Sequence, residues 1–171
     1  MFQKGDFLMF RNSGVCRVID IETPSFVEDK ERKYYRLEPV FPKKGLTVIY
    51  SPVDRNTSIR PLISKEEAKQ YLDDFGSLKV EIFHSAKPNF LNAHYNELLS
   101  SFTFENYLRL LKEIHLKEEE AVRKDRHLSQ VDLRYKEEAE QLVFEELAFI
   151  FGISCEEARK RFCSRAAAAM A

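Results

Sequence analysis

The sequence predicts an α+β protein in which a small N-terminal β-barrel is followed by a compact all-α domain. Up to about residue 60, short apolar alternations are separated by glycine and proline, which is typical of strands and turns. From Ser64 onward the apolar residues recur at helical spacing. The 171 residues, 44% hydrophobic and 32% charged, suit one domain or two small ones. We expect the barrel at 1–63, a connecting helix at 64–76 and the helical domain at 77–171.

Several short segments of the N-terminal region are rich in β-branched and aromatic residues. The turn sequences RNSG and PKKG separate some of them. Short strands packed into so few residues are typical of a small curled barrel. The predicted strands are 7–10, 15–21, 33–40, 46–51 and a short one at 58–60.

The strand predicted at 46–51 is stopped by Pro52. Proline has no N–H to donate to a ladder, so a strand that runs into one belongs at the edge of a sheet. An uncovered edge presents unpaired backbone groups and invites pairing with another chain. The sequence therefore raises the question of which partner pairs with this edge.

Helix starts are indicated by capping boxes, in which a serine hydroxyl accepts the amide of the third helical residue. Ser64 and Glu67 form such a box, and we expect this helix to end at Gly76 in the left-handed conformation. Related patterns predict further helices that begin near 89, 103, 129 and 154. The predicted core stripes of the third and fourth helical segments are Phe104, Tyr107, Leu108, Leu111 and Ile114, and Tyr135, Ala139, Leu142, Val143, Leu147 and Ile150.

Motifs for catalysis or metal binding are not found in the sequence. The four histidines have neither an HExxH pair nor a cysteine cluster beside them, and the three cysteines have no CxxC spacing. Nucleophile-elbow and phosphate-loop motifs are also missing. We expect no enzyme, no cofactor and no metal, and a hydrolase or redox enzyme built on Cys16 or the histidines is the least favoured alternative.

The net charge and the hydropathy of the chain bear on its expected compartment and on how it could contact DNA or a membrane. The formal net charge is −1, so the chain lacks the strong positive field of a self-sufficient nucleic-acid binder. The N-terminus is charged from the outset, and no apolar run approaches a membrane span. We expect a cytoplasmic protein, a monomer without membrane contact, whose contacts with DNA are local or assisted.

Blocks along the chain resemble the CarD/CdnL family of bacterial transcription regulators. They are FQKGDFLMFRNSGVCRVIDIE, YYRLEPV and LTVIYSPVDRNTSIRPLIS in the N-terminal region, in the same order and with similar spacing. LSQVDLRYKEEAEQLVFEELAFIFG is similar to the long helix of that family. The resemblance implies a Tudor-like barrel that docks on the RNA polymerase β subunit, as does the related module of transcription-repair coupling factor.

The same resemblance implies an answer to the question of the edge strand. In the family, the matching strand adds to a sheet of the polymerase, where main-chain bonds give affinity and alternate side chains give specificity. Ile49 departs from the arginine that some relatives carry there. The implied RNA polymerase-binding residues are Leu46, Thr47, Val48, Ile49, Tyr50, Ser51 and Pro52.

In typical members the helical module wedges a tryptophan into promoter DNA and so favours the open complex. This chain has no tryptophan, and the segment NFLNAHY places Phe90 or Leu91 there, with Ala93 and His94 where basic residues usually precede the matching Tyr95. An apolar wedge still unstacks a base step. The candidate residues for weak DNA binding are Phe90, Leu91, His94, Arg123, Lys124 and Arg126.

The resemblance and the residues together predict a non-enzymatic transcription regulator. The barrel holds the RNA polymerase β subunit, and the helical domain acts weakly on promoter DNA during open-complex formation. Tethering raises the local concentration of the helical domain to about the millimolar range, so weak DNA affinity suffices. The alternative is a polymerase-binding adaptor whose helical domain binds a protein in place of DNA.

Overall fold

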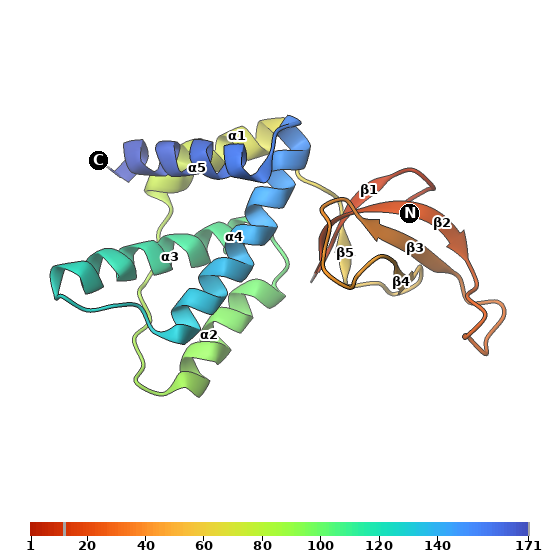
Figure 1. The fold of residues 1–171 in the computed structure, drawn as a ribbon, viewed down its shortest axis with the longest axis horizontal. Coiled ribbons are helices and arrows are strands. Elements are labelled where there is room, and N and C mark those ends of the chain that lie inside the picture. The colour runs from red at the N-terminus through yellow and green to blue at the C-terminus, as the bar shows by residue number, and fades with distance from the viewer. Residues whose placement is uncertain (12, 171) are drawn as a thin grey trace. The chain divides into compact units, whose positions relative to one another are not determined.

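The computed structural model describes residues 1–11 and 13–170, and it divides into two compact units, Met1–Leu62 and Ile63–Ala171. The first unit is a curled antiparallel sheet and the second is a set of packed helices (Figure 1). This arrangement confirms the predicted α+β class. In the described part of the chain, every helix is too short or too polar to cross a lipid bilayer.

The sheet of the first unit has five strands in the order β4-β3-β2-β1-β5. Every neighbouring pair is antiparallel, and the sheet curls into a half-barrel whose outermost strands are β4 and β5 (Figure 1). The strands are β1 (Phe7–Phe10), β2 (Gly14–Glu22), β3 (Tyr34–Pro39), β4 (Ile49–Pro52) and β5 (Ile59–Arg60).

The concave side of the sheet holds the core of this unit. Side chains alternate between the two faces of a strand, so every second residue of β2 and β3 points inward. A bulge between Val18 and Asp20 lengthens β2 by one residue and lets Ile21 return to the core face. The fully buried cluster is Leu8, Cys16, Val18, Tyr35 and Leu37.

The edge strand β4 begins three residues later than the sequence predicts. Gly45 has a φ of +77°, and Lys43 and Leu46 form an isolated bridge around it. This left-handed glycine makes a tight turn, which consumes the residues that were assigned to the strand. Thr47 and Val48 therefore lead from the turn into a strand that starts at Ile49.

The helices that capping patterns predict start at those residues, whereas the helix expected near 89 begins at Pro88 without a side-chain cap. Ser64 and Ser129 form complete capping boxes, and the hydroxyls of Thr103 and Ser154 each accept the amide three residues later. The elements are α1 (Lys65–Asp74), the short 3-10 helix η1 (Phe75–Ser77), α2 (Pro88–Ser100), α3 (Phe104–Arg123), α4 (Gln130–Phe151) and α5 (Cys155–Met170).

The expected left-handed stop at Gly76 is wrong. Helix α1 runs directly into η1, and Lys112 of α3 donates from Nζ to the carbonyls of Gly76 (2.7 Å) and Leu78 (2.6 Å). Gly76 is therefore part of a 3-10 turn, and its own carbonyl is bound by a lysine from another helix. The left-handed C-cap occurs instead at Gly152, with φ +66°, at the end of α4.

The long helices α3 and α4 form the centre of the second unit, and α1 lies beside α5 (Figure 1). All residues of the predicted α3 stripe are buried, whereas Leu142 and Ile150 of the predicted α4 stripe are half-buried. Tyr95 of α2 is fully buried among them. The second unit therefore has its own apolar core, built mainly from helix faces with a period of 3.6 residues.

A buried polar network connects α2, α3 and α4. The Asp132 carboxylate accepts hydrogen bonds from the Tyr95 hydroxyl (2.6 Å), Lys117 Nζ (3.0 Å) and the Ser129 hydroxyl (2.7 Å). Lys117 Nζ also donates to the Phe83 carbonyl, 3.0 Å away. Because Asp132 is 2% exposed, its charge is stable there only with these partners.

The network shifts the proton affinity of two of its members. Burial alone would raise the pKa of the Asp132 carboxyl, but hydrogen bonds from Tyr95, Ser129 and Lys117 outweigh burial and lower that pKa. Burial, followed by the hydrogen bond to Asp132, raises the pKa of the Tyr95 hydroxyl. Asp132 is therefore charged and Tyr95 neutral at neutral pH.

The division of the chain predicts that the fragment Met1–Leu62 folds alone, because its core cluster lies entirely within it. We expect a β-type circular dichroism spectrum and a cooperative thermal transition for this fragment. A fragment that ends at Phe75 should gain no stability, because α1 packs within the second unit. A non-cooperative transition in the short fragment, with cooperative melting of the full chain, would contradict independent folding.

The buried network predicts a large effect of Asp132→Asn on stability. The substitution leaves the Lys117 charge buried without its carboxylate, so the free energy of unfolding in urea at pH 7 should fall by about 3 kcal/mol. Tyr95→Phe should cost about 1 kcal/mol, because Asp132 retains its other partners. Arg161→Ala, which removes an exposed ion pair with Glu157, is the matched control and should have little effect.

The same network predicts a pH dependence. Because the folded-state pKa of Asp132 lies below its unfolded value of about 4, its contribution is present above that pH and is lost as pH falls through the folded-state pKa. Urea titrations of the wild-type protein should therefore show declining stability below about pH 4. If the Asp132→Asn variant shows the same slope in this range, other carboxylates cause it.

Candidate functional site

Within residues 1–11 and 13–170, the edge strand β4 has a hydrogen-bonded neighbour strand on one side only, β3. The amide of Val53 donates to the Lys33 carbonyl (3.0 Å), which marks that pair as a hydrogen-bonded one. Hydrogen-bonded and non-hydrogen-bonded pairs alternate along an antiparallel ladder. The N–H and C=O groups of Tyr50 therefore point away from β3, toward the open side of the sheet.

The backbone groups of Pro52 point to the same side as those of Tyr50, because the two residues are two positions apart in the strand. The missing N–H of Pro52 is thus on the open side and costs no ladder bond with β3. Its carbonyl accepts a hydrogen bond from Asn56 Nδ2 at 2.5 Å. Backbone groups available to an added strand are consequently centred on Tyr50, and the predicted segment 46–52 offers a short edge.

The structure shows which side chains of β4 lie on each face of the sheet, which the sequence alone did not determine. Ile49 lies opposite Leu37 and packs against the core, and Ser51 is 2% exposed. Tyr50 and Pro52 lie on the outer face. Before the strand, Thr47 is exposed while Leu46 and Val48 are half-buried. A strand added to β4 would thus meet Tyr50 on its outer face.

The outer face beside β4 carries an aromatic group that sequence reasoning missed. Phe26, in the loop between β2 and β3, is 68% exposed and packs edge-on against Tyr50, with ring centroids 5.2 Å apart. The Tyr50 hydroxyl donates to Glu22 across β3 (3.2 Å). Arg36 of β3 lies directly opposite Tyr50. The alternation of side chains within YYRLEPV is enough to put Arg36 on the face opposite to the inward Tyr35. The position of Phe26 beside Tyr50 has no such signal in the neighbouring sequence.

Of the two predicted wedge residues, only Phe90 is at the surface. Phe90 is 57% exposed near the start of α2, whereas Leu91 is 3% exposed and packs inside the unit. Because consecutive helical residues point in directions about 100° apart, α2 presents one of the two and buries the other. The assignment of Leu91 as a surface wedge is therefore corrected.

One cation that the sequence did not single out accompanies Phe90. Lys87 Nζ lies 5.5 Å from the centre of the Phe90 ring. On a different side of α2, Arg134 of α4 donates to the side-chain oxygen of Asn92. This surface thus combines an exposed aromatic ring with positive charge, a combination suited to nucleic-acid contact.

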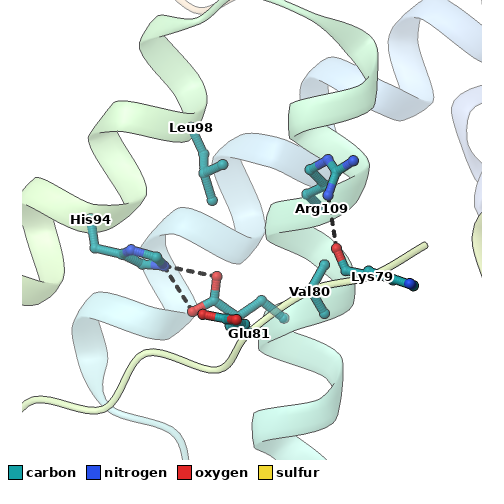
Figure 2. Close-up of a pocket in the computed structure, with 7 residues that line it drawn as sticks. Lys79, Val80, Glu81, His94, Leu98 and Arg109 are labelled. Atoms are coloured by element: carbon teal, nitrogen blue, oxygen red, sulfur yellow. Dashed lines mark hydrogen bonds and ion pairs between the residues drawn. The ribbon is translucent and has the colours of Figure 1, made fainter.

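The imidazole of His94 is paired with the carboxylate of Glu113 within the helical unit. Its Nε2 is 2.8 Å and 2.9 Å from the two carboxylate oxygens of Glu113 (Figure 2), and its ring stacks on Phe83 at a centroid distance of 4.6 Å. Glu113 also accepts the Phe83 amide (3.0 Å). Nε2 is therefore engaged, and any contact of His94 with a phosphate would have to use Nδ1.

A hollow of about 400 Å³ lies beside this pair (Figure 2). Arg109 on its wall donates to Glu105 and to the Lys79 carbonyl (2.8 Å), so its charge is used within the protein. Among residues 1–11 and 13–170, no group of three or more histidine, cysteine or acidic side chains is placed to hold a metal ion. The lining residues are Lys79, Val80, Glu81, His94, Leu98, Arg109 and Glu113.

The remaining predicted DNA contacts lie elsewhere on the helical unit. Arg123, Lys124 and Arg126 are exposed at the C-terminal end of α3, where Lys124 pairs with Glu120 (3.0 Å). That end of α3 and the start of α2, where Phe90 lies, are at different corners of the unit (Figure 1). The structure therefore does not combine these cations and Phe90 into one site.

Comparison with known families assigns the first unit. The family model of the CarD-like/TRCF RID domain matches residues 2–63, which cover the half-barrel with its edge strand β4. No match was found among curated proteins. The recognition made from FQKGDFLMFRNSGVCRVIDIE and the two following blocks is confirmed for this part of the chain. The N-terminal unit is a member of the CarD-like/TRCF RID domain family.

Proposed function

We propose that this chain is a transcription regulator that binds the RNA polymerase β subunit through β4 and acts on promoter open-complex formation with its helical unit. The RID domain indicates RNA polymerase interaction and is a protein-interaction domain with no catalytic role of its own. The single observation that carries the β4 proposal is an edge strand, within that domain, with outward-pointing backbone groups at Tyr50.

Strand addition fits the chemistry of this edge. Main-chain hydrogen bonds to an added strand need free N–H and C=O groups in an extended segment, which β4 supplies around Tyr50. Departure from the arginine of some relatives at Ile49 matters little, because Ile49 packs against the core and its side chain is not offered to a partner. The edge is short, so side chains must add to the affinity.

The helical unit would reach DNA with the surface around Phe90. An exposed apolar ring supports insertion at a base step, and Lys87 supplies local positive charge. The chain as a whole has a net charge of −1, so DNA contact should depend on tethering by the polymerase-bound unit. Stabilising an opened promoter is then a population shift caused by preferential binding of that state.

The edge-strand proposal predicts that Val48→Pro weakens binding to purified β subunit at least about tenfold, because proline directly before β4 removes a main-chain N–H from the segment 46–52 that is proposed to pair. Val48→Ala keeps this N–H and is the matched control, with near wild-type affinity. Binding is measured by biolayer interferometry on variants with wild-type circular dichroism spectra. Equal affinity of the proline and alanine variants would argue against main-chain pairing here.

The DNA proposal predicts weak binding in isolation and a kinetic effect in the complex. With few phosphate contacts, free protein should bind promoter DNA no tighter than about 0.1 mM at physiological salt. Together with polymerase it should change open-complex lifetime, and Phe90→Ala should abolish that change while polymerase binding persists. Val122→Ala, at a 71% exposed position on α3, is the matched control and should act as wild type.

Two outcomes separate DNA binding from the adaptor alternative. A Phe90→Ala variant that keeps its melting temperature and loses the kinetic effect supports DNA contact. An unchanged open-complex lifetime with wild-type protein bound to polymerase would reject the DNA mechanism. The exposed Phe90 and Leu133 would then support a helical unit that recruits a protein.

A further inference from the structure

The outer face of the sheet next to β4 holds a cation without a counter-charge. Arg36 is half-buried, and its Nε is enclosed without a hydrogen-bond acceptor in the described part of the chain. Within those residues no carboxylate lies within 4.0 Å of its guanidinium. A partly buried arginine without an acceptor is unusual, because burial of an unpaired charge is costly.

Nearby acidic residues are engaged elsewhere. Asp20 lies opposite Arg36 on β2, but its carboxylate is 3.8 Å from Lys4 Nζ and accepts the Ile21 amide (2.9 Å). Glu22, the next outward residue of β2, accepts the Tyr50 hydroxyl. Arg36 thus has acidic neighbours in the sheet and an ion pair with neither of them.

The position of Arg36 relates it to the open edge. Arg36 and Tyr50 form a non-hydrogen-bonded cross-strand pair, the kind in which side chains approach most closely. A strand added to β4 would place one residue opposite Tyr50 on the same outer face. That residue and Arg36 would be two interstrand spacings apart, about 10 Å, which the two long side chains of glutamate and arginine span together.

Phe26 and Tyr50 complete the surface that such a residue would contact. Phe26 is held by its edge-on contact with Tyr50 and remains 68% exposed. An exposed ring beside an open strand edge offers apolar area for the methylene groups of a long side chain. Arg36 lies one strand farther from the open edge, within the combined reach of the two long side chains.

We infer that Phe26, Tyr50 and Arg36 form a specificity site that reads the outward-facing residue of the strand added to β4, and that this residue is acidic, with glutamate the best fit. This inference rests on the proposed binding of the RNA polymerase β subunit through β4. Charge complementarity with Arg36 identifies the carboxylate, and the aromatic pair favours the longer of the two acidic side chains.

The test compares variants of the full chain for binding to purified β subunit. Arg36→Leu should weaken binding about 10- to 100-fold, because a charged hydrogen bond is lost and the partner carboxylate is left unpaired. Arg36→Lys should retain most of the affinity, and Phe26→Ala should lose at least about fivefold. Arg17→Leu, on the same face but on β2, is the matched control and should bind as wild type.

Measurements at two salt concentrations and a melting curve for each variant complete the test. The Arg36→Leu variant should show a weaker salt dependence of its affinity than wild type. Wild-type affinity in Arg36→Leu, or equal losses in Arg36→Leu and Arg17→Leu, would overturn the inference. A loss in Phe26→Ala alone would also overturn it, since the partner residue would then be apolar.

The Val48→Pro and Val48→Ala pair in the same assay separates the two proposals. If Val48→Pro loses binding and Arg36→Leu binds as wild type, the edge-strand proposal is supported and the inference of an acidic partner residue is rejected. Wild-type protein that does not bind the β subunit removes both proposals together. Losses in Val48→Pro and Arg36→Leu, but not in Val48→Ala and Arg17→Leu, support both.

Discussion

Packing of Ile49 against the core, beside its cross-strand neighbour Leu37, is the contact on which the whole recognition surface depends. The side-chain period of a strand is two, so one buried residue fixes the direction of every other residue in β4. It turns Tyr50 to the outer face and leaves its backbone groups on the open side. A slip of one residue would bury Tyr50 and bring the core residue Ile49 to the surface. The apolar core therefore determines what this edge can offer to a partner.

In the helical unit, a buried charge has the corresponding role. Asp132 caps its own helix α4, fixes Tyr95 of α2 and neutralises Lys117 of α3. Each bond is individually weak, but removing the carboxylate would leave a lysine and a tyrosine hydroxyl buried without it. Since Tyr95 lies on the same helix as Phe90, this network also fixes how α2 presents its exposed aromatic residue.

Features that depend on residues close together in the sequence were predicted correctly, and those that depend on contacts between distant residues were not. Serine caps act within four residues, so the starts of α1, α4 and α5 were found correctly, and the recognised blocks identified the half-barrel. The conformation of Gly76 was predicted wrongly, and Lys112, distant in sequence, binds the carbonyls of Gly76 and Leu78. The start of β4 was missed because Gly45 turns the chain. Which of Phe90 and Leu91 is exposed, and where Phe26 lies, depends on packing between distant segments.

The hydrogen bond from Asn56 to the Pro52 carbonyl limits self-association. The nitrogen of Pro52 cannot donate a hydrogen bond, and its carbonyl already accepts one from Asn56. The C-terminal end of β4 therefore cannot pair with a second strand. Two copies that met edge to edge would share few main-chain bonds around Tyr50 and could not extend into a long ladder. Growth of an intermolecular sheet is thereby disfavoured at the same strand that is open to a partner. Affinity at this edge must then come from a partner whose side chains fit the outer face.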